Sequence, residues 1–154
     1  MIFEFGPYCV DVDVERTRRW YETEPTASQR CNCDGCVNFD RAADLFPESV
    51  KSFFASLGVD AKKPIEVYVN YTNRDGTLSY GGWYHLCGTL LAEGSDTWQV
   101  GKGAPLGPRG FQIWFREDCH IVQENCPRPV LQMELNADIP WVLEKEHTYE
   151  RERN

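Results

Sequence analysis

Apolar and polar residues alternate near the start of the chain in the manner of a strand. In "YCVDVDVE", residues 8 to 15, aspartates separate Val10, Val12 and Val14, which is the period-2 pattern of a half-buried strand. A short helix, "ERTRRWYE", is predicted next, with Asp13 as its candidate N-cap. The following segment, "TEPTASQR", is predicted to be a loop.

From Gly35 onward the apolar residues follow helical spacing, and the first group shares one face: Cys36, Phe39, Ala43 and Phe46. Pro47 then stands at a favoured first-turn position. The next apolar residues repeat as i, i+3, i+4 and i+7: Val50, Phe53, Phe54 and Leu57. Gly58 lies where a C-terminal cap is expected. Two helices are therefore predicted, and Cys36 lies on the apolar face of the first.

The second half of the chain has the alternation of strands. "IEVYVNY" and "LSYGGWYHLCGTLLA" form a predicted hairpin around the turn "NRDG", with Gly81 and Gly82 marking a bulge or a close approach. "VGKGAPLGPRG" predicts a long exposed loop. "FQIWFR", "CHIVQE" and "PVLQMELN" predict three further strands. The charged tail, "EKEHTYERERN", is predicted to be a solvated turn of helix or a frayed end.

This order of elements predicts the α+β class. We expect one domain over residues 1–154, with an antiparallel sheet packed by two or three helices that lie mainly in the N-terminal half. The chain contains eight Phe, seven Tyr and five Trp, so it can fill a core without a metal or a disulfide. A metal site is therefore not required to form the core.

The charge balance limits the classes of partner. The net charge is −8, and nucleic acids and anionic membranes both attract basic surfaces. Binding to either is therefore not expected. A protein partner with a basic surface, or a small neutral ligand, fits the charge better.

The sequence also bounds the compartment. No basic segment followed by a long apolar stretch stands at the N-terminus, and no apolar run approaches the ~20 residues that span a bilayer. We therefore expect a cytoplasmic protein. Its seven cysteines are then reduced thiols or metal ligands, and their odd number argues against a fully paired set of disulfides.

Three of the cysteines lie close together in "RCNCDGCVNF", residues 30 to 39. Cys31, Cys33 and Cys36 have the spacing C-x-C-x-x-C. Thiolates bind Zn²⁺ at about 2.3 Å, and structural zinc takes four ligands in a tetrahedron. Gly35 lets the backbone turn tightly between two thiolates. The spacing predicts a metal site, with zinc as the expected ion.

A fourth ligand has to come from another part of the chain. The candidates are Cys9, His85, Cys87, Cys119, His120 and Cys126. His85 and Cys87 are favoured, because residues i and i+2 of a strand project from the same face. A bound structural zinc contributes on the order of 10 kcal/mol to folding. The predicted ligand set is therefore the three clustered cysteines together with His85 and Cys87.

Two other interpretations of these cysteines stay open. Free cysteine often packs in a core as a small hydrophobe, and Cys36 lies on an apolar helix face. Cys33 and Cys36 also open a predicted helix, whose N-terminus stabilises a thiolate, although Asp34 opposes that effect. The alternative function is thus a thiol–disulfide redox protein, or a Cys-dependent enzyme, that uses Cys33 and Cys36.

Several segments follow one another in a distinctive order: "CNCDGCVNF", a Phe-rich helix, "KPIEVYVN" and "YGGWYHLCG". This order, over about residues 1–90, resembles that of small bacterial proteins that carry no established activity. The resemblance implies only that the three cysteines and Asn38 form one unit. From the residues themselves we expect a small binding or interaction protein with a structural zinc site, in which the Asn38 amide steadies a sulfur or a loop carbonyl.

Overall fold

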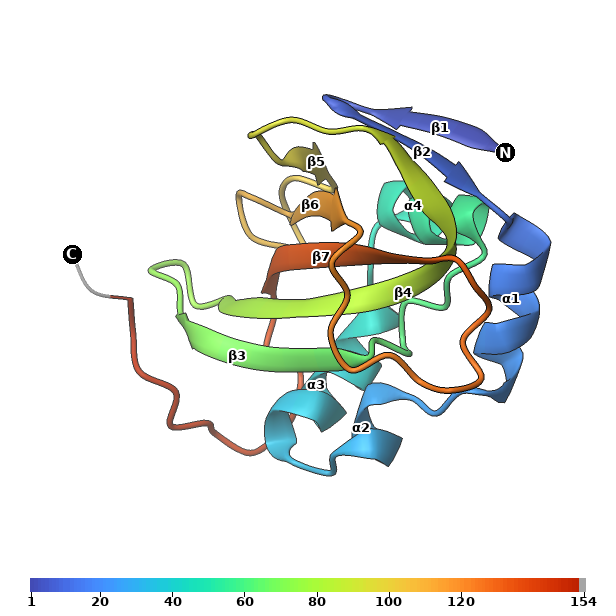
Figure 1. Ribbon diagram of the computed structural model, residues 1–154. Coiled ribbons are helices and arrows are strands. Elements are labelled where there is room, and N and C mark those ends of the chain that lie inside the picture. The colour runs from blue at the N-terminus through green and yellow to red at the C-terminus, as the bar shows by residue number, and fades with distance from the viewer. Residues whose placement is uncertain (153–154) are drawn as a thin grey trace.

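The computed structural model describes residues 1–152 and has the predicted α+β architecture. Four helices precede residue 58, and the larger part of the strands follows them (Figure 1). The helices are α1 (Val14–Thr23), α2 (Ala27–Arg30), α3 (Asp34–Ala43) and α4 (Glu48–Leu57). The strands are β1 (Ile2–Phe5), β2 (Tyr8–Val12), β3 (Glu66–Thr72), β4 (Leu78–Ala92), β5 (Trp98–Val100), β6 (Phe111–Arg116) and β7 (Val130–Ile139).

Strand β4 organises the seven-stranded antiparallel sheet. On one side it pairs with β3 over its first part and with β2 over its last part, and on the other side it pairs with β7. Gly82 lies where β3 comes close, since a Cβ there would stand 2.3 Å from the carbonyl oxygen of Glu66. The predicted close approach at Gly82 is confirmed. Beyond β7 the sheet continues through β6 to β5.

Aromatic side chains join the helices to the inner face of the sheet. Phe39 of α3 packs on Tyr80, and Phe54 of α4 packs on Tyr84 and Phe111, with ring centroids 5.0 to 5.7 Å apart. All five side chains are buried. Full burial of one such side chain contributes about 1.5–3 kcal/mol, so these pairs supply a large part of the core's stability.

The helix boundaries follow local chemistry. The carboxylate of Asp13 accepts a hydrogen bond from the amide of Arg16 at 3.1 Å, so the predicted N-cap of α1 is confirmed. Gly58 ends α4 with a φ of +79°, and a Cβ there would lie 2.4 Å from the carbonyl oxygen of Val14. Only glycine fits that position. Pro47 is the N-cap of α4 rather than a residue of its first turn.

Two local predictions were wrong, and two short strands were missed. The segment "TEPTASQR" contains the short helix α2, and the strands β1 and β5 were not expected. The segment "CHIVQE" is not a strand: Ile121 has a φ of +56°, which interrupts any extended run. Instead, the carbonyl oxygen of His120 accepts a hydrogen bond from the ring of Trp83 at 3.2 Å. This hydrogen bond helps to hold residues 117–129 as a loop against the sheet.

The C-terminal segment, residues 140–152, is extended and bound to the body of the protein, not helical or frayed. The amide of Thr72 donates to the carbonyl of Glu150 at 2.7 Å, and the amide of Glu152 donates back to Thr72 at 2.8 Å. Near its start, the amide of Val142 donates to the side chain of Asn38 at 2.7 Å. The segment therefore runs past α3 to the end of β3 (Figure 1).

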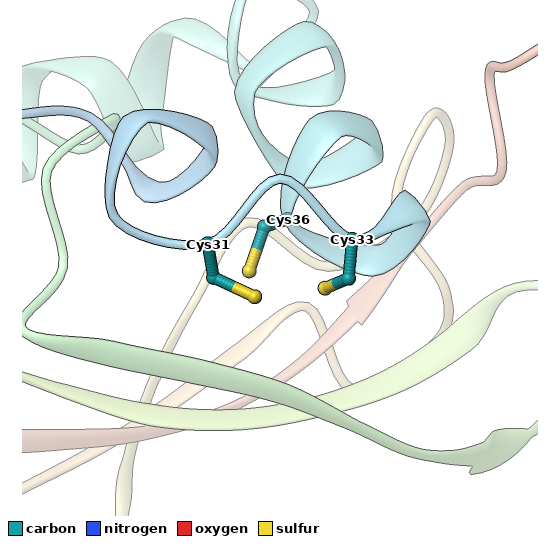
Figure 2. A group of neighbouring side chains, drawn as sticks. All are labelled: Cys31, Cys33 and Cys36. Atoms are coloured by element: carbon teal, nitrogen blue, oxygen red, sulfur yellow. The ribbon is translucent and has the colours of Figure 1, made fainter.

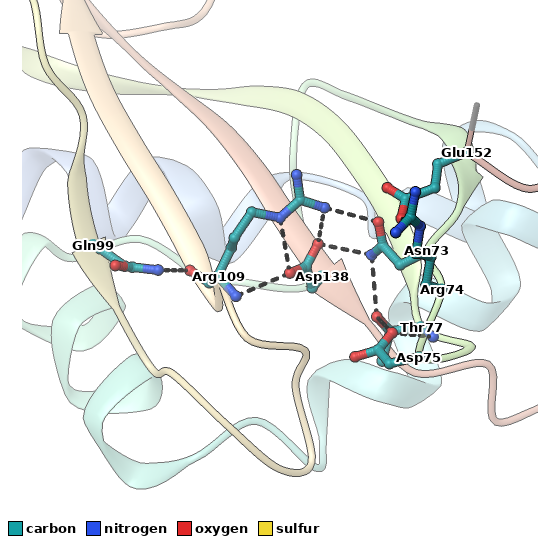
Figure 3. A network of polar contacts seen from close by, with 8 residues as sticks. All are labelled: Asn73, Arg74, Asp75, Thr77, Gln99, Arg109, Asp138 and Glu152. Atoms are coloured by element: carbon teal, nitrogen blue, oxygen red, sulfur yellow. Dashed lines mark hydrogen bonds and ion pairs between the residues drawn. The ribbon is translucent and has the colours of Figure 1, made fainter. Parts of the chain in front are cut away.

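The glycine- and proline-rich loop before β6 is fixed by a buried carboxylate. Asp138 of β7 accepts hydrogen bonds from the backbone and the guanidinium of Arg109, and from the amide of Asn73 at 2.8 Å (Figure 3). The guanidinium also donates to Asn73 at 2.8 Å. The ion pair between the half-exposed Arg109 and the buried Asp138 thus joins this loop to β7, and the hydrogen bonds to Asn73 connect both residues to the β3–β4 turn. Within residues 1–152, no helix is both long enough and apolar enough to cross a membrane.

Candidate metal centre

The three clustered cysteines bring their sulfur atoms together. The Sγ atoms of Cys31, Cys33 and Cys36 all lie within 4.8 Å of one another (Figure 2). Three thiolates bound to one tetrahedral zinc stand about 3.8 Å apart, as follows from Zn–S bonds of about 2.3 Å. The sulfurs therefore need to move by no more than about 1 Å to share an ion.

Short-range structure produces this convergence. Cys31 is the C-cap of α2, Cys33 is the N-cap of α3, and Cys36 lies in the first turn of α3. Asp40 of α3 accepts hydrogen bonds from the hydroxyl of Thr26 at 2.9 Å and from the amide of Ser28 at 3.2 Å. Asp40, which follows the cysteine loop, thus joins α3 to the start of α2, which precedes the loop. This contact limits how far the sulfurs can separate.

Gly35 is needed at this site for its small size. Its φ is not positive, so the tight turn that the sequence suggested is not its role; it lies within α3. A Cβ on Gly35 would stand 2.9 Å from the hydroxyl oxygen of Tyr149 and 3.3 Å from a methyl group of Val69. Its carbonyl oxygen accepts a hydrogen bond from the hydroxyl of Tyr80 at 2.8 Å. The loop is therefore packed against both the sheet and the C-terminal segment.

Asn38 supports the loop indirectly. Its buried side-chain amide donates to the hydroxyl oxygen of Tyr80 at 3.0 Å and to the carbonyl of Pro140 at 3.1 Å. Tyr80 in turn donates to Gly35. The prediction was that the Asn38 amide steadies a sulfur or a loop carbonyl; in the structure Asn38 reaches the Gly35 carbonyl through the hydroxyl of Tyr80.

The three thiols differ in exposure and in acidity. Cys31 and Cys33 are exposed, and Cys36 is buried. Burial raises the pKa of Cys36, and the neighbouring Cys33 and Cys31 raise it further. The pKa of Cys31 is lowered, first by a hydrogen bond from the backbone of Cys33 and then by the thiols of Cys33 and Cys36. Cys31 therefore ionises more readily than Cys36, and a bound cation would favour the thiolate form of Cys36.

The structure brings together three of the five predicted ligands. Within residues 1–152, the group of candidate metal donors around these sulfurs includes neither His85 nor Cys87. The ring Nε2 of His85 lies 2.9 Å from the side-chain oxygen of Gln132, and the thiol of Cys87 lies 3.5 Å from the carbonyl of Arg128. Both belong to the last part of β4, beyond the part that pairs with β3. The clustered cysteines lie beside β3 instead (Figure 2).

Comparisons with protein-family models, with curated proteins and with solved structures found no match to this chain. Its function is therefore argued from the site alone.

A small pocket lies next to the cysteines and was not foreseen from the sequence. Its volume is about 120 Å³, and it reaches Cys31 and Cys36 between α2, α3 and the start of β3. The other residues that line it are Ala27, Arg30, Pro64, Ile65, Glu66 and Val67. Arg30 and Glu66 are far apart in the sequence, so no local pattern could have paired them beside the thiols.

Proposed function

We propose that this protein binds one zinc ion through Cys31, Cys33 and Cys36, and that the ion fixes the α2–α3 junction beside β3. The single observation that carries the proposal is the convergence of three sulfurs from two helices within 4.8 Å. Thiolate sulfur is a soft ligand that favours zinc and copper(I) over magnesium or calcium. Zinc is proposed because it accepts three thiolates and adapts to a further ligand of another kind.

The exposure of two of the three cysteines supports a metal site over simple packing in the core. A cysteine that serves as a small hydrophobe is expected to be buried among apolar side chains. Cys36 fits that description, but Cys31 and Cys33 are exposed and still point toward Cys36 (Figure 2). Packing of apolar groups gives no reason for two exposed thiols to turn toward a third.

In this proposal the zinc stabilises one corner of the fold and not the whole of it. The aromatic core joins α3 and α4 to the sheet without the cysteines. The protein is then a small binding or interaction protein whose partner, a basic protein surface or a small ligand, contacts a corner that the metal keeps rigid. Since thiols stay reduced in the cytoplasm, the proposal includes a cytoplasmic location.

Elemental analysis of the full chain, produced without a polyhistidine tag, tests the proposal. We expect about one zinc per chain, and less than about 0.2 of any metal per chain discards it. Cys33→Ser is the informative variant. Serine is a good N-cap residue, and the thiol of Cys33 makes no capping hydrogen bond, so α3 is expected to persist while zinc is lost. Cys119→Ser, in the loop at residues 117–129, is the matched control and should keep its zinc.

A redox function is the second candidate. The thiol of Cys33 is exposed at the N-terminus of α3, close to Cys36, and the two are not joined by a disulfide. Burial raises the pKa of Cys36, which makes Cys36 a slow attacking thiol. Cys33 is the exposed member of the pair, so it is the expected attacking thiol. This candidate predicts one fast-reacting thiol near neutral pH in metal-free protein, together with a reversible Cys33–Cys36 disulfide. Thiol titration with and without chelator distinguishes it from the zinc site.

A further inference from the structure

Three thiolates leave one position on a tetrahedral zinc ion without a protein ligand. Within residues 1–152, no fourth histidine, cysteine or carboxylate side chain joins the cluster of Cys31, Cys33 and Cys36. Two of the three cysteines are exposed, so an ion bound by them would lie near the surface. Sites of this kind hold a water or an exchangeable ligand at the fourth position.

The neighbouring pocket limits the size of such a ligand. Its volume of about 120 Å³ is below the about 300–1,000 Å³ that is usual for sites that enclose drug-sized ligands. Because Cys31 and Cys36 form part of its wall, a ligand in the pocket can reach an ion bound by the sulfurs. The pocket therefore suits a small molecule, and a ligand as large as a tripeptide thiol would not be enclosed.

Charges of both signs stand on the pocket wall. Arg30 lines the pocket, and its guanidinium pairs with Glu24 at 3.0 Å. Glu66 is exposed on the same pocket and forms no ion pair in that part of the chain. The wall thus suits a ligand that carries both a carboxylate and an ammonium group.

We propose that this pocket binds a small zwitterionic aminothiol of the free-cysteine class, whose sulfur takes the fourth position on the zinc. The inference rests on the proposed zinc site. The ligand's thiol loses its proton to solvent, its sulfur bonds to zinc, and the water held there leaves. Its carboxylate faces Arg30, and its ammonium group faces Glu66. Inorganic phosphate lacks a soft donor and is repelled by Glu66, so it does not fit.

Cobalt(II) in place of zinc provides the test on the full chain, because sulfur-to-cobalt charge-transfer absorption grows with each bound sulfur. L-cysteine is titrated beside cysteamine, which lacks the carboxylate, and 3-mercaptopropionate, which lacks the ammonium group. Saturation with L-cysteine is expected to raise the absorption by about a third, as three sulfurs become four. Each truncated thiol is expected to bind about tenfold more weakly.

Three variants assign the charges. Glu66→Gln is expected to remove the preference for L-cysteine over 3-mercaptopropionate, while the exposed loop variant Glu117→Gln keeps it. Arg30→Lys, which keeps the charge but not the geometry of the guanidinium, should reduce the preference over cysteamine.

The outcomes separate the two proposals. If the protein binds no cobalt, the zinc site itself is wrong. If cobalt binds and the absorption does not change with L-cysteine, or the three thiols bind equally, the aminothiol proposal is wrong and the metal site stands. Removal of cobalt by L-cysteine, detected by native mass spectrometry as loss of the metal without a ternary complex, also overturns it.

Discussion

The hydroxyl of Tyr80 donates a hydrogen bond to the carbonyl oxygen of Gly35 at 2.8 Å. Tyr80 belongs to β4 and is fully buried, while Gly35 lies between two of the clustered cysteines. The same hydroxyl accepts a hydrogen bond from the amide of Asn38 at 3.0 Å. The central strand of the sheet therefore positions the cysteine loop directly.

Tyr80→Phe is expected to weaken zinc binding while the fold persists. Loss of the hydroxyl leaves the Gly35 carbonyl and one Asn38 N–H without their partner, at a cost of about 1–3 kcal/mol in the free energy of unfolding. Groups that orient metal ligands change metal affinity by about 10–100-fold, so a loss in that range is expected. Zinc competition with a chromophoric chelator, together with urea unfolding, measures both. Tyr68→Phe, on the exposed side of β3, is the control and should leave both quantities unchanged.

Gly35→Ala is expected to displace the C-terminal segment. Alanine favours a helix by up to about 1 kcal/mol over glycine, but its Cβ would stand 2.9 Å from the Tyr149 hydroxyl oxygen. Relief of that contact requires Tyr149 to move, and Tyr149 belongs to the segment bound along Thr72. Faster tryptic cleavage after the exposed Lys145, followed by mass spectrometry, is the expected readout.

A second substitution makes this prediction specific. Tyr149→Phe removes the hydroxyl oxygen, and the nearest remaining ring carbon would lie 3.9 Å from the alanine Cβ, which is an ordinary contact. Gly35→Ala in the Tyr149→Phe background should therefore not accelerate cleavage beyond Tyr149→Phe alone. Equal acceleration in both backgrounds would show that the clash with Tyr149 is not the cause.

The parts of the fold that the sequence predicted are those that depend on near neighbours. Helix α4 could be predicted because its apolar spacing and its Gly58 cap are local signals. The convergence of Cys31, Cys33 and Cys36 is likewise local, since all three lie within six positions at the junction of two helices. Short spacing alone was enough to predict this part of the candidate site.

The parts that were missed depend on partners far away in the chain. Strands β1 and β5 are short, and Phe5 and Trp98 from these two strands pack with ring centroids 4.9 Å apart, a contact between residues distant in the sequence. The i, i+2 spacing of His85 and Cys87 could show a shared strand face but not the position of that face relative to the cysteines. The C-terminal segment has charged residues typical of a solvated tail, yet the buried Asn38 binds its beginning.

His85 is expected to make the protein less stable in mild acid. Burial lowers the pKa of its imidazole, and this effect outweighs the hydrogen bond to Gln132, which raises the pKa; Arg30 and His120 nearby lower it further. The unfolded chain takes up a proton near pH 6.5 while the folded protein does not, so stability is full above that pH and decreases as the pH falls below it. The buried Nδ1 has no hydrogen-bond partner within residues 1–152 that would favour protonation.

Urea unfolding between pH 7.5 and pH 5 measures this effect. It is best carried out in the Cys33→Ser background, where loss of zinc in acid cannot contribute. His85→Gln retains a donor for Gln132 but does not titrate, so its stability should decrease less over the same range. Parallel decreases in the two proteins would assign the acid sensitivity to other groups.

Removal of zinc is expected to loosen the cysteine corner and the C-terminal segment together. Lys145 pairs with Asp34 at 3.1 Å, and Tyr149 packs on Gly35, so the segment is anchored on the loop that the metal holds. Hydrogen exchange after chelation should therefore become faster, by about tenfold or more, in residues 27–38 and 140–152. Amides of β4 and β7 should keep their protection, because their pairing does not involve the three clustered cysteines.

Cys33→Ser with zinc present should reproduce the pattern. A uniform loss of protection would mean that the metal supports the whole fold, and no change would mean that the segment is held independently of it.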